Sequence, residues 1–113
     1  MKGTYCLLIN VKKDSKIKIG KLGRLNFKKG YYVYVGSALS SLDKRIERHL
    51  SNNKKKHWHI DYLLMNKNSE IKKIFYKKAK KECEFANQIK KFGIGIKNFG
   101  GSDCKCGSHL FRI

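Results

Sequence analysis

Acidic residues are scarce in this chain of 113 residues, which has 8 Asp and Glu against 27 Lys and Arg. The formal net charge is therefore +19, and the sequence pI is about 10.0. Proline is absent, and this absence, with the abundance of Lys, Ile and Asn, is also typical of a biased genome composition. Whatever its origin, such a charge attracts polyanions through counterion release, so nucleic acid is the expected partner.

Long apolar runs are also missing. No stretch approaches the roughly twenty apolar residues that cross a bilayer, and no apolar signal segment follows Met1, so we expect a cytoplasmic protein without a membrane partner. Disulfides are then not expected, and the four cysteines are core residues or metal ligands: Cys6, Cys83, Cys104 and Cys106. There is no internal repeat and no linker, so residues 1–113 are expected to form a single domain.

The hydrophobic pattern predicts an α/β fold with a small, mainly antiparallel central β-sheet flanked by helices. Residues 5–11 form an apolar run and residues 16–19 alternate, with turn residues at 13–15 between them, which together indicate a hairpin. Residues 31–36 (YYVYVG) are rich in aromatic and β-branched side chains, as is typical of a strand. Further along, we expect helices at 40–50, 57–65 and 80–92, a strand at 70–76 and a closing strand at 109–113.

Side-chain periodicity assigns faces to two of these elements. On the strand at 31–36, Tyr32 and Tyr34 share one face, so one face packs and the other is available to a ligand. Ser40 to Asp43 has the form of a capping box at the start of a helix. The inward face of that helix is expected to carry Leu42, Ile46, His49 and Leu50, and Arg45 lies one turn before His49 on one side.

Residues suited to phosphodiester hydrolysis are present. The reaction needs a base for the attacking water, a cation for the charge that develops on the phosphoryl oxygens, and stabilisation of the leaving oxygen. Tyr34 lies at the end of the strand, and Arg45 can form a bidentate contact with phosphate. His49 has a side chain that ordinarily titrates near neutral pH. A hard divalent ion could be held by Glu82 or Glu84.

Two short motifs carry a family resemblance. Gly3-Thr4-Tyr5 and Tyr34-Val35-Gly36 are similar to the two motifs of the GIY-YIG nuclease superfamily, each with a changed middle residue. More closely, the chain resembles an uncharacterised prokaryotic branch of that superfamily, in some chains fused to an endonuclease III type DNA-repair glycosylase. The further matching positions are Arg45 and His49, residues 57–63 (HWHIDYL), Glu82-Cys83, Asp103-Cys104 and residues 109–111 (HLF).

The resemblance implies a GIY-YIG-like fold and a role for each site residue. Tyr34 would activate water, with Tyr5 nearby, and Arg45 would stabilise the pentacovalent phosphate. His49 would support proton transfer, and Glu82 would bind one Mg²⁺ or Mn²⁺ on the leaving-group side. The late Asn of the superfamily matches either Asn87 or Asn98. The expected function is metal-dependent hydrolysis of DNA, more than RNA, in repair or processing; the alternative is a catalytically inactive nucleic-acid-binding module.

Two other groups of residues have more than one interpretation. His57 and His59 either face metal or phosphate, with Asp61 orienting one of them, or belong to a helix anchored by Trp58 and Ile60. The segment from Asp103 to His109 with Cys104 and Cys106 is either a zinc site or, more in keeping with its spacing, a tight turn. The residues expected to bind nucleic acid are Lys54, Lys55, Lys56, His57 and His59.

Overall fold

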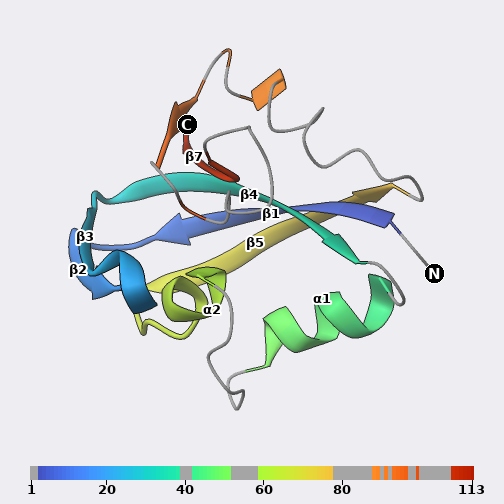
Figure 1. Cartoon of the computed structure of the whole chain (residues 1–113), viewed down its shortest axis with the longest axis horizontal. Helices are drawn as coiled ribbons and strands as arrows, with labels where there is room; N and C mark the ends of the chain where they lie inside the picture. Colours follow the sequence, from blue (N-terminus) through green and yellow to red (C-terminus); the bar gives the residue numbers. More distant parts are fainter. Residues whose placement is uncertain are drawn as a thin grey trace.

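An antiparallel sheet organises the chain, as a computed structural model shows (Figure 1). The structure describes residues 3–38, 42–51, 59–77, 88–89, 91, 93–96, 99 and 108–113. The main sheet has five strands in the order β5-β1-β4-β7-β6, and a second sheet pairs β2 with β3. The strands are β1 (Gly3–Val11), β2 (Ser15–Lys18), β3 (Arg24–Phe27), β4 (Gly30–Ala38), β5 (Ser69–Lys77), β6 (Ile94–Gly95) and β7 (Leu110–Arg112). The predicted fold class is therefore confirmed.

Strand β1 lies between β4 and β5 and supplies the middle of the core. Its odd-numbered residues from Tyr5 to Val11 are buried, whereas Cys6, Leu8 and Asn10 on the other face are half-buried. This is the period-two pattern of a strand with one face against a core. The predicted strands at 31–36 and 70–76 are confirmed as parts of β4 and β5, and the predicted closing strand at 109–113 contains β7.

The predicted hairpin between residues 5–11 and 16–19 is wrong in its pairing. Both strands exist, but β1 pairs with β4 and β5, and β2 pairs with β3. The short 3₁₀ helix η1 (Gly20–Leu22) connects β2 to β3, and Gly20 and Gly23 around it take positive φ angles of 45° and 80°. These backbone angles suit glycine, so the tight turn lies there and not at residues 13–15.

Two helices cover the same face of the main sheet, α1 (Leu42–Leu50) and α2 (His59–Leu64) (Figure 1). Ile60 and Leu63 of α2 are fully buried in the same core cluster as Leu7 and Ile9. On α1, Ile46 and His49 face inward as predicted, but Leu50 is 55% exposed, which corrects its inward assignment. Leu50 is the last residue of α1 and lines the hollow between this helix, α2 and β5.

Tyr32 and Tyr34 of β4 are buried on the helix-covered side, so the tyrosine face is the packed face. Tyr31 on the opposite face is 47% exposed.

Of the helix predicted at 80–92, residues 88–89 are helical and most of the remainder lies outside the described residues, as does the predicted cap residue Ser40. None of the helices in the described ranges is long and apolar enough to span a membrane.

The register of β1 against β4 places Tyr5 directly opposite Gly36. A Cβ atom at Gly36 would lie 2.4 Å from both Cζ and the hydroxyl oxygen of Tyr5, far inside van der Waals contact. The Tyr5 ring therefore lies across the backbone of Gly36, and only glycine leaves room for it there.

We expect Gly36→Ala to lower the free energy of unfolding by about 1–3 kcal/mol, because the added methyl group overpacks the site. Chemical denaturation measures the change. Gly95→Ala is the matched control, since a Cβ there meets Phe111 at an ordinary 3.5 Å. In a Tyr5→Leu background the cost of Gly36→Ala should shrink; an unchanged cost would mean that the Tyr5 ring is not the obstacle.

Candidate active site

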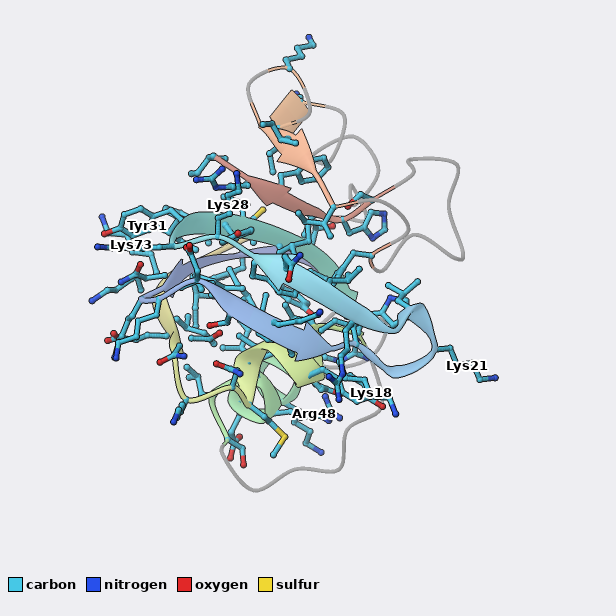
Figure 2. All side chains as sticks on the ribbon, turned by 90° about the vertical axis from the view of Figure 1, so that its left-hand side faces the viewer. Lys18, Lys21, Lys28, Tyr31, Arg48 and Lys73 are labelled. Carbon is cyan, nitrogen blue, oxygen red and sulfur yellow. The ribbon has the colours of Figure 1, made fainter. Side chains whose placement is uncertain are left out.

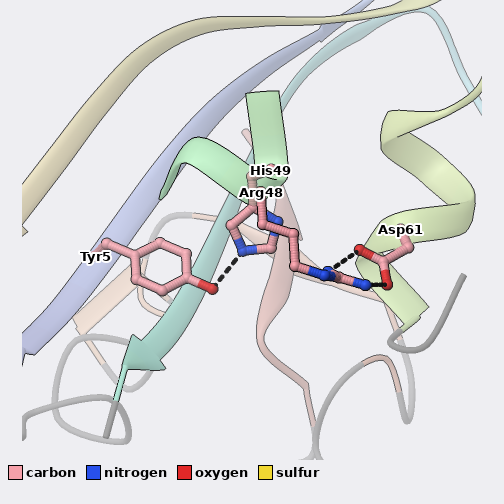
Figure 3. Close-up of polar contacts among 4 residues, drawn as sticks. All are labelled: Tyr5, Arg48, His49 and Asp61. Atoms are coloured by element: carbon pink, nitrogen blue, oxygen red, sulfur yellow. Dashed lines mark hydrogen bonds and ion pairs between the residues drawn. The ribbon is translucent and has the colours of Figure 1, made fainter. Parts of the chain in front are cut away.

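A buried hydrogen bond joins the first strand to the first helix. The hydroxyl oxygen of Tyr5 lies 2.6 Å from Nε2 of His49 (Figure 3). Tyr5 is 1% exposed and His49 is 2% exposed, so water does not compete for this contact. The neighbours of these two residues explain the geometry: Gly36 lets the phenol pass over β4, and α1 presents His49 to it.

Tyr34 completes a cluster of three rings, which we call the Tyr-His cluster (Tyr5, Tyr34 and His49). The ring centroid of Tyr34 lies 6.4 Å from that of Tyr5 and 6.3 Å from that of His49, in tilted and edge-on arrangements. The centroids of Tyr5 and His49 are 5.2 Å apart. Tyr34 is 9% exposed and is thus the most accessible member of the cluster.

The pair Tyr5–His49 can hold and pass a proton. A neutral imidazole with an unprotonated Nε2 accepts the phenolic proton, and an imidazole ordinarily titrates near neutral pH. A hydroxyl held against an imidazole is the arrangement that enzymes use for general acid–base chemistry. The structure thus brings together three of the residues that the sequence singled out.

Arg45 lies on α1 one turn before His49 and is half-buried. Residues four apart on a helix are neighbours on its surface, so the guanidinium and the imidazole belong to the same side of α1. A guanidinium is suited to bidentate hydrogen bonding with a phosphate.

An ion pair that sequence reasoning missed connects the two helices. Arg48 Nη1 and Nη2 donate to Oδ1 and Oδ2 of Asp61 at 2.8 and 2.9 Å (Figure 3). The Asp61 side chain is fully buried, and that of Arg48 is 27% exposed. The hydrogen bonds to Asp61 raise the pKa of Arg48. The signal in the sequence was Asp61 itself, because a carboxylate inside the apolar segment at 57–65 needs a cationic partner.

His59 packs against an aromatic ring, although it was expected to bind nucleic acid. Its ring centroid lies 5.6 Å from that of Phe99, in an edge-on arrangement, and partial burial lowers the pKa of His59. The imidazole is therefore biased toward its neutral form. The other residues expected to bind nucleic acid, Lys54, Lys55, Lys56 and His57, lie outside the described residues.

The expected metal ligands fall largely outside the described part of the chain, which is the case for Glu82, Glu84, Cys83, Cys104 and Cys106. Asn87 and Asn98, the two candidates for the late Asn of the superfamily, also lie outside it. Among the residues that are described, no three His, Cys, Asp or Glu side chains gather closely enough to hold a metal ion.

Cys6 is half-buried, and burial raises the pKa of its thiol to about 11. The Cys6 thiol therefore stays protonated at neutral pH.

A small hollow of about 180 Å³ opens beside His49, where α1, α2 and β5 meet. Its volume is below that of sites that enclose a drug-sized molecule. It is lined by His49, Leu50, Leu64, Ser69, Glu70 and Ile71.

Comparison with protein families gives a match over nearly the whole chain. The model of the family described as "Domain of unknown function DUF123" matches residues 4–113. The chain belongs to this family. The matched region of the DUF123 domain contains every residue of the Tyr-His cluster, as well as Arg45 and the ion pair between Arg48 and Asp61. Comparisons with curated proteins and with solved structures find no match.

We expect the two partners of the ion pair to respond unequally to neutral substitution. Arg48→Gln removes the guanidinium from a fully buried carboxylate, whereas Asp61→Asn leaves a guanidinium that can still reach solvent. Arg48→Gln should therefore destabilise the domain by about 2–3 kcal/mol and Asp61→Asn by about 1–2 kcal/mol. Urea titrations of both variants measure this difference. Lys44→Gln, which changes an exposed residue of the same helix, is the control, and equal losses in all three variants would contradict the account.

Proposed function

We propose that this DUF123 domain is a nuclease that hydrolyses nucleic-acid phosphodiester bonds with a divalent metal, acting on DNA in repair or processing. The observation that carries the proposal is the hydrogen bond between Tyr5 and His49, with Arg45 one turn away on the same helix. The formal charge of +19 supports a polyanionic substrate.

The Tyr-His cluster supplies the proton chemistry of the proposed reaction. Tyr34 is its most accessible member and contacts the attacking water. Nε2 of His49 takes up the proton through the Tyr5 hydroxyl group, which passes its own proton to Nε2 as its oxygen receives one from the reacting water, and the same hydrogen bond fixes the orientation of the imidazole. Arg45 contacts the phosphoryl oxygens, where negative charge develops in the transition state.

The resemblance to the GIY-YIG nuclease superfamily supports both the reaction and its metal requirement. The pairing of Tyr5 with Gly36 joins the two motifs that carry this resemblance. Glu82 is the residue that would hold Mg²⁺ or Mn²⁺, and the ion would stabilise charge on the leaving oxygen. Zinc bound through Cys104, Cys106 and His109 is the alternative metal, with a structural role.

A catalytically inactive binding module is the rival function. It would use the same positive charge but would have no need of a buried phenol–imidazole pair. Burying two polar groups costs desolvation that two apolar side chains of similar shape would avoid. The presence of this pair within the core therefore favours an enzyme.

Removal of either partner of the proton-transfer pair should reduce cleavage. We expect Tyr5→Phe and His49→Gln to lower the single-turnover rate by about 10²- to 10⁴-fold, the usual range for general acid–base catalysis. The substrates are labelled nicked, branched and single-stranded DNA with Mg²⁺ or Mn²⁺. Tyr31→Phe is the matched control, because Tyr31 lies on β4 but on the exposed face, and its rate should not change.

Loss of the phosphate-contacting cation should have a comparable effect. Arg45→Ala should lower the rate by about 10²- to 10³-fold, as expected for the removal of an electrostatic contact to the transition state. Arg45→Lys retains the charge without the bidentate geometry, so its cleavage rate should lie between those of the wild type and of Arg45→Ala. Residual activity that is equal in the wild type and in Arg45→Ala would identify a contaminating nuclease. Salt-dependent binding without turnover in any metal would favour the binding module.

A further inference from the structure

The β2–β3 hairpin carries an unusual concentration of charge. Between residues 12 and 29 the chain has eight basic residues and a single acidic one, Asp14. Asp14 lies before β2, and its Oδ1 accepts a hydrogen bond from the backbone N–H of Lys29 at 2.7 Å. The basic residues are Lys12, Lys13, Lys16, Lys18, Lys21, Arg24, Lys28 and Lys29.

The register of the hairpin separates its two faces. Ile17 pairs with Leu25 on the side that packs against the core, next to the buried Phe27. On the outer side, Lys16 pairs with Asn26 and Lys18 pairs with Arg24, and all four of these residues are exposed. We call these four residues the basic face. Lys21 extends from the hairpin tip away from the body of the molecule (Figure 2).

The basic face contains a pair of like charges. Lys18 and Arg24 are directly opposite each other, an arrangement that destabilises a sheet. A bound polyanion would relieve this repulsion, so the hairpin is better suited to the bound state than to the free protein.

Packing fixes the hairpin relative to the candidate active site. The ring centroid of Phe27 lies 6.3 Å from that of Phe99, and Phe99 lies 6.3 Å from Tyr34 of the Tyr-His cluster, both in edge-on arrangements. At the tip, a Cβ atom on Gly20 would lie 3.4 Å from the ring of Tyr62 on α2. A ligand held by the basic face therefore has a defined position relative to the site.

We propose that the basic face of the β2–β3 hairpin binds the backbone phosphates of a nucleic-acid duplex and holds it beside the Tyr-His cluster. The inference rests on the proposed function for the nature of the ligand and adds the double-stranded form and the surface that contacts it. The face presents no aromatic ring on which unpaired bases could stack, and this favours a duplex over a single strand. It presents no apolar anchor for a lipid surface either. A two-stranded ribbon also fits the major groove of DNA.

A charge-matched pair of variants tests the proposal. One variant carries Lys16→Gln, Lys18→Gln and Arg24→Gln; the control carries Lys73→Gln, Lys91→Gln and Arg112→Gln, which remove the same charge outside β2 and β3. Binding of a 20-base-pair DNA duplex is measured by fluorescence anisotropy in EDTA over a range of salt concentrations. Thermal melting confirms that each variant is folded.

The hairpin variant should bind the duplex about 30- to 100-fold more weakly at 0.15 M salt. The slope of the logarithm of its binding constant against the logarithm of the salt concentration should be shallower by about 2 to 3, because each phosphate contact contributes about 0.9 to that slope. The control variant should lose only the small part of the duplex affinity that depends on the overall net charge. Equal losses in the two variants would overturn the proposal, because the binding would then follow the overall field.

Three further arms separate the alternatives. Lys18→Glu should weaken duplex binding while leaving the melting temperature of the free protein unchanged or higher, because it replaces a repulsive pair with an attractive one. If the hairpin variant loses binding to phosphatidylserine vesicles but keeps duplex binding, the face is a membrane surface and the proposal is wrong. The third arm compares duplex binding in EDTA with cleavage in Mg²⁺ for the wild-type protein: binding through the basic face without cleavage would contradict only the proposed nuclease, so failure of catalysis and failure of the hairpin to bind are distinguishable.

Discussion

The contact of Tyr5 with Gly36 is the constraint on which the rest of the site depends. Because Gly36 lacks a side chain, the Tyr5 ring lies across β4 and its hydroxyl group reaches Nε2 of His49 at 2.6 Å. One residue on β1, one on β4 and one on α1 are thereby fixed relative to each other within the core. The polar pair is buried, so its geometry is held by packing and not by a mobile surface loop.

The helices are fixed by a second polar contact of a different kind. Arg48, the residue next to His49, points to α2 and forms two hydrogen bonds with Asp61. Consecutive residues of α1 thus hold the helix to the sheet on one side and to α2 on the other (Figure 3). The orientation of His49 and the position of Arg45 both follow from this double attachment, which links the packing of the helices to the proposed chemistry.

Local patterns in the sequence predicted the strands well but not how they pair. The apolar run at 5–11 and the aromatic run at 31–36 mark β1 and β4, yet the partners of β1 lie far along the chain, and the turn-like residues at 13–15 suggested a nearer one. Tyr5, Tyr34, Arg45 and His49 were found through their spacing and the resemblance to a nuclease family. The pairing of Arg48 with Asp61 depends on how two helices pack, which no local pattern encodes. Leu50 was predicted to face inward because helical periodicity cannot show which side chains at the end of a helix are covered.

We propose that the Tyr-His cluster and Arg45 surround a phosphate of a bound nucleic acid. The most direct measurement is a crystal structure of the wild-type protein with a short DNA duplex and Ca²⁺ in place of the catalytic metal. We expect a backbone phosphate in contact with Arg45 and beside Tyr34, with the hydrogen bond between Tyr5 and His49 retained. A duplex bound on another face, with Arg45 and Tyr34 away from any phosphate, would contradict it.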